Sequence, residues 1–259
     1  MQLPPIPTEL QKALRGYVPV REVIGKSGDG VFRLEAPSRQ TLIIKVFDCA
    51  RADRLQAEAA RINWLRSIGI QVPRVLDALS ASAGCWLVME CLPGNNATVA
   101  LDKPAVKVRE IGAALASLHS VTADACPFDE TLSTKIALAK INVDNNRVDV
   151  EDFDDDHLGF GAKELFQAMQ RLQPSIEEIV VTHGDASLPN MMLNEGKFTG
   201  FVDCGKVGRA DRYQDLALTC RSIKFNLGPE WVGPFLWSYG ATSIDEERMR
   251  FYRMLDEFF

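Results

Sequence analysis

The chain has 259 residues, of which 46% are hydrophobic and 25% are charged, so it is long enough to bury the core of one large domain or of two lobes. Its 29 lysines and arginines against 35 acidic residues give a net charge of −6 without any dense basic cluster, which argues against nucleic acid or an anionic membrane as the main partner. No apolar run approaches the roughly 20 residues that cross a bilayer, and the N-terminus lacks the pattern of a secretory signal, so we expect a cytoplasmic protein.

The first third of the chain is predicted to be rich in β-strands. Short segments of apolar and β-branched residues are separated there by Gly, Asp, Pro and Ser, which is typical of strands joined by turns. Apolar residues at helical spacing predict one helix, which ends before Gly69. The predicted strands are 18–24, 31–35, 41–47, 75–79 and 85–90, and the predicted helix is 52–67.

One lysine of this β-rich part is a candidate nucleotide contact. Leu42-Ile43-Ile44-Lys45 is similar to the V-A-I-K strand of protein kinases, whose lysine contacts the α- and β-phosphates. A single lysine in an apolar strand is more often a solvent-facing edge residue. Glu58 on the following helix favours the functional interpretation, because an ion pair with a helix carboxylate holds such a lysine in place.

Two other segments of this part are weaker candidates. Residues 25–30 are glycine-rich and include Ser27 as a possible phosphate contact, but they lack the Gly-Lys-Ser/Thr ending of a Walker A loop, and an ordinary hairpin turn is an equal alternative. Glu90 and Leu92 end the last predicted strand where a kinase hinge holds adenine. Only their order along the chain supports that role.

The remainder of the chain is predicted to be mainly helical. A β-rich first part, a turn at 92–94 and a helical remainder predict an α+β fold of two lobes, 1–92 and 93–259. The predicted helices are 105–119, 132–142, 162–172, 211–224, 230–239 and 244–258, and the predicted short strands are 179–182, 191–193 and 199–202.

The strongest chemical signal lies on the loops that follow two of these short strands. His183-Gly184-Asp185 is followed by Asn190 at the spacing of the kinase loop H-R-D-x-x-x-x-N, and Asp203-Cys204-Gly205 stands where the metal-binding D-x-G is expected. Phosphoryl transfer needs one carboxylate for the attacking hydroxyl, and an amide oxygen and a second carboxylate for Mg²⁺. The alternative is an ordinary polar loop, which does not explain the spacing. We therefore predict Asp185 as the catalytic base and Asn190 and Asp203 as metal ligands, with ATP and Mg²⁺ as cofactors.

Acidic residues gather at two further places. Residues 151–156 carry five carboxylates in six positions, which indicates either a solvated face or a site for a ligand with several ammonium groups. Asp256 and Glu257 stand beside the terminal carboxylate of Phe259. His119 and His157 have no evident partners in the sequence, and none of the six cysteines lies in a C-x-x-C pair, so we expect reduced and mostly buried thiols.

Several short stretches, in order along nearly the whole chain, resemble the bacterial aminoglycoside 3'-phosphotransferases, which are antibiotic-resistance kinases with the protein-kinase fold. These stretches are 126–129, 152–156, 181–190, 200–205, 210–215 and 255–259. The resemblance implies transfer of the ATP γ-phosphate to the 3'-hydroxyl of kanamycin- or neomycin-like substrates. It implies that Lys45, Glu58, Glu90, Leu92 and Lys206 serve the nucleotide. It also assigns antibiotic binding to Asp155, Asp156, Asp185, Arg221, Glu257 and the Phe259 carboxylate, beside which Asp256 is a further candidate.

The sequence departs from the family pattern at three positions. Lys206 replaces an arginine of some relatives, and Phe225 and Asn226 replace acidic residues that grip the drug's amines in some relatives. These changes leave open which aminoglycosides are accepted. The sequence also leaves open the choice between ATP and GTP and the oligomeric state. The alternatives are a kinase for another small hydroxyl compound, such as choline, homoserine or a macrolide, and a nucleotide-binding pseudokinase without activity.

Overall fold

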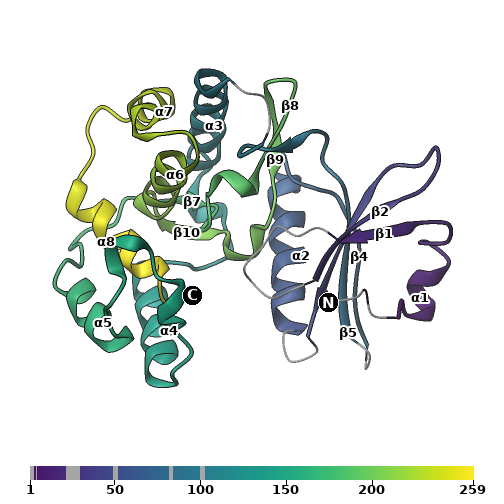
Figure 1. The fold of residues 1–259 in the computed structure, drawn as a ribbon, viewed down its shortest axis with the longest axis horizontal. Helices are drawn as coiled ribbons and strands as arrows, with labels where there is room; N and C mark the ends of the chain where they lie inside the picture. The colour runs from purple at the N-terminus through teal and green to yellow at the C-terminus, as the bar shows by residue number, and fades with distance from the viewer. Residues whose placement is uncertain (1–2, 4, 22–29, 49–51, 82–83, 100–102) are drawn as a thin grey trace. The chain divides into compact units, whose positions relative to one another are not determined.

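The computed structural model describes residues 3, 5–21, 30–48, 52–81, 84–99 and 103–259. The chain forms two compact units, the first made of Met1–Asn96 and Met191–Gly205 and the second of Ala97–Asn190 and Lys206–Phe259 (Figure 1). The segment Met191–Gly205 thus belongs to the first unit, although it follows the boundary that the sequence suggested after residue 92. Among the described helices, none is long and apolar enough to span a membrane.

The first unit is built on an antiparallel sheet of five strands in the order β1-β2-β3-β5-β4. Its elements are α1 (Thr8–Gln11), β1 (Val18–Arg21), β2 (Gly30–Glu35), β3 (Leu42–Phe47), α2 (Ala52–Ser67), β4 (Val75–Ala81) and β5 (Gly84–Glu90). A second, small sheet pairs β6 (Asn95–Asn96) with β8 (Met191–Asn194), and β8 with β9 (Lys197–Phe201).

Alternation along β3 decides which side chains enter the core of this unit. Leu42, Ile44 and Val46 point to one face, where they pack with Trp86 and Val88 of β5. The residues between them point to the opposite face, because side chains alternate along a strand. Lys45 is one of these, and it therefore faces α2.

The second unit is mainly helical. Its helices are α3 (Pro104–His119), α4 (Leu132–Asp144), α5 (Ala162–Gln170), α6 (Tyr213–Asn226), α7 (Val232–Tyr239) and α8 (Glu246–Asp256), and its two strands, β7 (Ile179–Thr182) and β10 (Gly208–Asp211), pair antiparallel. Short 3₁₀ turns of this unit lie at Ala123–Ala125, Val150–Asp152, Asp155–His157, Leu188–Asn190 and Pro229–Trp231, and a further one, Cys204–Lys206, begins in the first unit.

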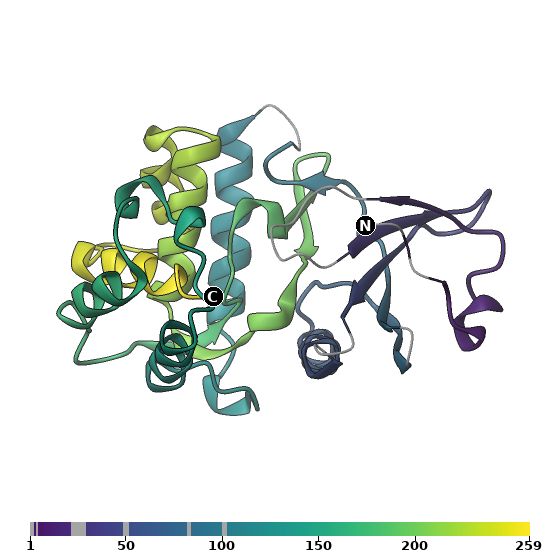
Figure 2. The ribbon, with the colours of Figure 1, turned by 60° about the horizontal axis from the view of Figure 1, so that its bottom comes forward.

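Helix α6 forms the centre of the second unit, since nearly all of its residues from Tyr213 to Ile223 are buried. Helices α3 and α7 pack side by side (Figure 2). Gly112 makes their close approach possible, because a Cβ at this position would lie 2.8 Å from Cβ of Ser238.

The predicted fold class is confirmed, and the helix 52–67 and the strand 179–182 have the predicted bounds. Three predicted helix starts, at residues 211, 230 and 244, are wrong by two residues, and α8 begins at Glu246. Asp211 belongs to β10, where it pairs with Ile179, and its carboxylate accepts a hydrogen bond from the Tyr213 N–H at 3.1 Å, so that α6 begins two residues later. Pro229–Trp231 is a 3₁₀ turn, and α7 begins at Val232.

Candidate functional site

Lys45 in the first unit is held by two carboxylates. Its Nζ lies 2.7 Å from Oε1 of Glu58 and 2.8 Å from Oδ1 of Asp203. Burial acts to lower the pKa of Lys45, but the two carboxylates outweigh it and raise that pKa above its ordinary value. The ion pair with Glu58 that the sequence predicted is therefore present, and Asp203 is a second partner that the sequence did not indicate.

Asp203 follows β9 in an unusual backbone conformation. Its φ is +59°, in the left-handed region that non-glycine residues rarely adopt and that Asp tolerates better than most. Its side chain is 48% exposed although one oxygen binds Lys45, so solvent reaches this carboxylate. The next residue, Cys204, is fully buried, and burial raises the pKa of its thiol. At this turn the Cys204 side chain is therefore buried, and the Asp203 side chain is accessible to solvent.

The predicted hinge residues lie at the end of β5 and directly after it, in the same unit. Glu90 binds Arg74 through a hydrogen bond of 2.8 Å from Nε, and this bond lowers the pKa of the Glu90 carboxyl. The N–H of Cys91 donates to the carbonyl of Thr41 at 3.0 Å. Within the described part of the chain, no hydrogen bond uses the N–H of Leu92, so this donor is available to a ligand. Ser27 and nearly all of its glycine-rich loop lie outside the described residues.

The predicted catalytic loop follows β7 in the second unit. Gly184 has a φ of +81°, and a Cβ there would lie 2.1 Å from the carbonyl oxygen of Lys206, so only glycine fits between His183 and Asp185. The backbone N–H of Asp185 donates to Nδ1 of the buried His183 at 3.3 Å.

Asn190 turns back onto the same loop. Its Nδ2 donates to the carbonyl oxygen of Asp185 at 3.0 Å, and that oxygen also accepts from the N–H of Ser187 at 2.8 Å. Because the amide nitrogen is committed to this carbonyl, the amide oxygen of Asn190 is the atom left for a ligand.

Three residues of α6, spaced four and three positions apart, bind this loop from one face of the helix. Asp215 accepts hydrogen bonds from the N–H groups of His183 at 2.6 Å and Gly184 at 2.8 Å. Thr219 donates to the carbonyl of Ala186 at 2.6 Å, and Ser222 accepts from the N–H of Leu188 at 3.0 Å. The loop that carries Asp185 therefore takes its shape from α6.

Asp215 has a further buried partner that the sequence did not reveal. Its Oδ2 lies 3.0 Å from Nε2 of His119, and Nδ1 of His119 lies 2.8 Å from the hydroxyl of Tyr239. Asp215 lies in the stretch 210–215, which contributes to the family resemblance, but the resemblance assigned no role to this residue. His119 at the end of α3 thus supports the loop indirectly, through its contact with Asp215.

Two of the residues predicted to bind the antibiotic, Arg221 and Asp256, form an ion-pair network with Asp154. Arg221 of α6 binds Asp154 and Asp256, each at 2.8 Å. Burial acts to lower the pKa of Arg221, and Asp256 and Asp154 outweigh it and raise that pKa. The exposed Asp155 has no partner among the described residues, whereas Asp156 lies 3.7 Å from Arg253. Arg221 and Asp256 are therefore bound to protein groups, and Asp155 is open.

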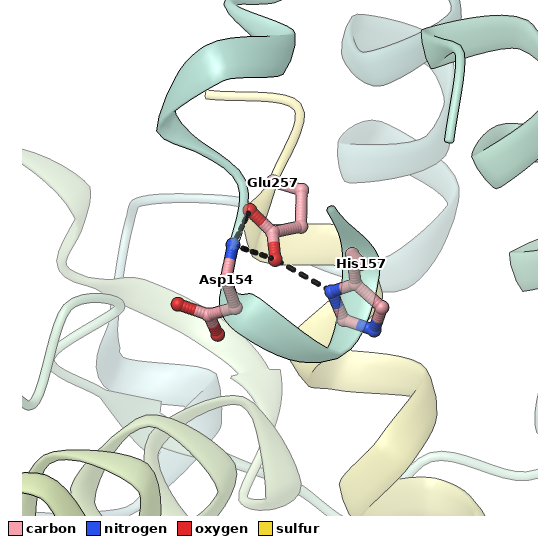
Figure 3. Close-up of side chains that lie close together, drawn as sticks. All are labelled: Asp154, His157 and Glu257. Carbon is pink, nitrogen blue, oxygen red and sulfur yellow. Dashed lines mark hydrogen bonds and ion pairs between the residues drawn. The ribbon is translucent and has the colours of Figure 1, made fainter. Parts of the chain in front are cut away.

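Glu257 connects the C-terminal end of α8 to the acidic loop (residues 149–157). Figure 3 shows its carboxylate turned toward His157 and toward the backbone of Asp154, while the Asp154 carboxylate points away. Oε1 of Glu257 lies 2.6 Å from Nδ1 of His157 and accepts from the Asp154 N–H at 3.1 Å. His157 therefore does have a partner, which is 100 residues away along the chain.

The last predicted residues lie near each other in the second unit. Nζ of Lys206 lies 5.8 Å from the centroid of the Phe259 ring, and Nζ of Lys135 lies 5.0 Å from it. Two cations thus flank the C-terminal residue, whose surface is 42% exposed. The carbonyl of Phe258 accepts a hydrogen bond from Asn142 at 2.8 Å, which fixes this end of the chain.

The oxygen donors of Asn190 and Asp203 fit the preference of Mg²⁺ for carboxylate and amide oxygens. Another group, Asp154, His157 and Glu257, brings three ligand atoms within 4.8 Å of one another. This group fits Mg²⁺ poorly, because it includes an imidazole, and because a backbone N–H and Arg221 already bind its carboxylates. This group is therefore a poor candidate for a magnesium site.

The family model described as "Phosphotransferase enzyme family" matches residues 20–252. An aminoglycoside 3'-phosphotransferase of Escherichia coli is 33% identical over 261 aligned residues, which cover 99% of this chain and 96% of the relative. A crystal structure of an aminoglycoside 3'-phosphotransferase of type VIII superposes with a TM-score of 0.87 at 34% identity, covering 97% of this chain and 98% of that one.

A second solved structure that is similar to this chain contains a bound nucleotide and a bound drug. It is an aminoglycoside phosphotransferase of Streptomyces rimosus in complex with ADP and streptomycin, with a TM-score of 0.83 and 27% identity over 96% of this chain and 95% of that one. The match of the family model over most of the sequence, and the identity to an aminoglycoside 3'-phosphotransferase over almost its whole length, show that this chain belongs to the phosphotransferase enzyme family.

Proposed function

We propose that the protein transfers the γ-phosphate of ATP to the 3'-hydroxyl of aminoglycosides of the kanamycin and neomycin type and thereby confers resistance to them. The observation that carries the proposal is the buried lysine, Lys45, bound at once to Glu58 and to the aspartate of the D-x-G turn. In kinases this lysine orients the α- and β-phosphates, and this aspartate holds the metal. The three charged groups Lys45, Glu58 and Asp203 are therefore all present, which argues against an inactive nucleotide-binding protein.

Each residue has a distinct task in the proposed reaction. Asp185 orients the acceptor hydroxyl and takes its proton as the oxygen bonds to the γ-phosphorus, while the bond from that phosphorus to the bridging oxygen breaks and ADP leaves. Asn190 and Asp203 hold Mg²⁺, which when bound neutralises the charge that develops on the phosphates. Lys45 and Lys206 are the cations for the phosphates, and the backbone of Glu90 and Leu92 holds adenine.

The acceptor class is supported by the relatives and by the acidic surface of the second unit. The Escherichia coli relative is a 3'-phosphotransferase of aminoglycosides, and aminoglycosides carry several ammonium groups at neutral pH. Asp155 and Asp156 are exposed carboxylates on a loop that an ion-pair network holds in place. Carboxylates in such a place attract a polycation and set its orientation.

A second acceptor deserves an equal test, because the similar Streptomyces rimosus structure contains streptomycin. Purified protein would be assayed for ADP release with kanamycin, with tobramycin, which lacks the 3'-hydroxyl, and with streptomycin, choline, homoserine and a macrolide. We expect turnover with kanamycin and none with tobramycin, and a matching pattern of resistance in a susceptible bacterial host. Equal turnover of tobramycin would contradict the 3' position, and turnover of streptomycin alone would favour the second acceptor.

Asp185→Asn tests the chemistry separately from binding. We expect kcat to fall at least about 100-fold, because the amide cannot accept the proton of the hydroxyl. Calorimetric titration with kanamycin is expected to show nearly unchanged affinity. A variant that keeps wild-type kcat would remove Asp185 from the proposed role.

A further inference from the structure

Three polar side chains of the second unit, Arg212, Tyr239 and His119, line one groove. Each of them stands at the end of a helix. Arg212 directly precedes α6, Tyr239 is the last residue of α7, and His119 is the last residue of α3. The ends of three helices therefore bring these groups together, although the groups are far apart in the sequence.

The three side chains form a chain of hydrogen bonds that ends at the catalytic loop. The Arg212 guanidinium hydrogen-bonds the Tyr239 hydroxyl, and that hydroxyl lies 2.8 Å from Nδ1 of His119. On the other side of the imidazole, Nε2 lies 3.0 Å from Oδ2 of Asp215. The chain thus leads from a cation to the carboxylate that accepts two backbone N–H groups of the catalytic loop.

The two ends of this chain set the direction of the hydrogen bonds between them. A guanidinium can only donate, and an ionised carboxylate can only accept. All the groups are used when Tyr239 accepts from Arg212 and donates to Nδ1 of His119, while Nε2 donates its proton to Asp215. Burial raises the pKa of Tyr239, although Arg212 acts to lower it, so the hydroxyl keeps this proton at neutral pH.

We propose that Tyr239 is a positioning residue of the catalytic loop, which together with Arg212 holds His119 as the neutral tautomer protonated on Nε2 and so keeps Asp215 directed at the loop. The side chains of His119 and Asp215 are 4% and 0% exposed, so a lost donor is not readily replaced by water at this point. The proposal rests on the proposed function for its kinetic test alone.

Nitrogen NMR of the free protein tests the tautomer without any substrate. The chain has three histidines, and the signal of His119 is identified by nuclear Overhauser contacts with the Tyr239 ring, whose centroid lies 5.4 Å from that of the imidazole. At neutral pH we expect the proton on Nε2 and none on Nδ1. A proton on Nδ1 in the wild type, alone or in an imidazolium, would overturn the proposal.

Tyr239→Phe removes the hydroxyl and keeps the ring. We expect kcat with kanamycin to fall about fivefold, the equivalent of one hydrogen bond of about 1 kcal/mol, because the loop that carries Asp185 is less well held. The KM values for kanamycin and ATP should stay within about twofold. The amide of Gly184, which donates to Asp215, is expected to exchange its hydrogen faster than in the wild type. Wild-type kcat together with wild-type exchange would refute the role of Tyr239.

Tyr213→Phe is the matched control, because it removes a hydroxyl of the same unit that lies outside the chain. This hydroxyl accepts the N–H of Asp245 at 3.0 Å. Its loss is expected to lower the free energy of unfolding but to leave kcat and the exchange of Gly184 at wild-type values. An equal fall in kcat in Tyr213→Phe and Tyr239→Phe would indicate general loosening of the unit and would contradict a specific chain.

A double variant tests whether Arg212 and Tyr239 act together. Arg212→Met is expected to lower kcat about as much as Tyr239→Phe, and the double variant should add little, because both changes interrupt one chain. Fully additive losses would show that the two residues act separately. If the wild type phosphorylates no aminoglycoside, the proposed function fails, while the tautomer of His119 and the exchange of Gly184 still decide whether Tyr239 supports the loop.

Discussion

Lys45 and Glu58 illustrate how a buried charge depends on its partner. Their side chains are 12% and 4% exposed, so each is costly to bury without the other. The raised pKa of Lys45 means that the stabilisation is fully present below its ordinary pKa of 10.5 and is lost only as pH rises beyond that value. Lys45 therefore stays charged throughout the neutral range, and its ionisation does not limit activity there.

Lys45→Met is expected to abolish most activity and to lower the free energy of unfolding by about 3 kcal/mol, because Glu58 is left buried without its cation. The double variant Lys45→Met/Glu58→Gln should recover stability to within about 1 kcal/mol of the wild type while activity stays low. Denaturant unfolding and the ADP-release assay measure the two effects. Equal instability of the single and double variants would contradict the explanation by loss of the ion pair between Lys45 and Glu58.

At the scale of elements, α6 organises the second unit. One face of the helix binds the backbone of the catalytic loop through Asp215, Thr219 and Ser222. Arg221, on another face, binds the acidic loop and the C-terminal end of α8. A single helix therefore contacts both the loop that carries the proposed base and the proposed drug-binding loop.

Thr219→Val tests this role of α6. Valine has nearly the same shape but leaves the buried carbonyl of Ala186 without its donor, so we expect a loss of about 1–2 kcal/mol in unfolding free energy. We also expect kcat to fall about tenfold, because the loop that carries Asp185 is less well held. Thr219→Ser keeps the hydroxyl and is the control. If valine and serine have equal effects on kcat, the hydrogen bond does not support the loop.

At the scale of the whole molecule, the described cysteines form no disulfide, and burial decides how reactive each thiol is. The described cysteines are all free, and four of them, Cys85, Cys126, Cys204 and Cys220, are buried. Burial raises the pKa of Cys220 to about 12, so at pH 8 only about one such thiol in ten thousand is ionised. Cys91 is the one described cysteine that is partly exposed.

Alkylation at pH 8 is therefore expected to modify Cys91 rapidly in the folded protein and the buried cysteines only after unfolding. Cys49, which lies outside the described residues, would first be replaced by serine. Mass spectrometry of peptides after timed alkylation gives the rates, and the same reaction in guanidinium chloride is the control. Rapid modification of native Cys220 would show that its surroundings open far more often than the packing of α6 implies.

Local patterns were sufficient wherever a feature depends on neighbours in the chain. The helix Ala52–Ser67 follows from its apolar spacing, and the Asp185-to-Asn190 spacing follows from the chemistry of one loop. The same reasoning failed at Asp211, whose sequence context reads as helix. Pairing with Ile179 places it in a strand, and Arg248 and Tyr252 of α8 bind its buried carboxylate. These partners come from distant segments, so no local pattern reveals them.

The sequence by itself therefore determined the fold class, the family resemblance and the identity of the chemical groups at the proposed site. The tertiary structure alone decided which charges are already paired. Asp203 reaches Lys45 across 158 residues, Asp215 reaches His119 across 96, and Glu257 reaches His157 across 100. A carboxylate looks the same in a sequence whether it meets a buried histidine or the solvent. Its burial and its hydrogen-bond partners, which exist only after folding, decide whether it holds the protein together or remains open to a ligand.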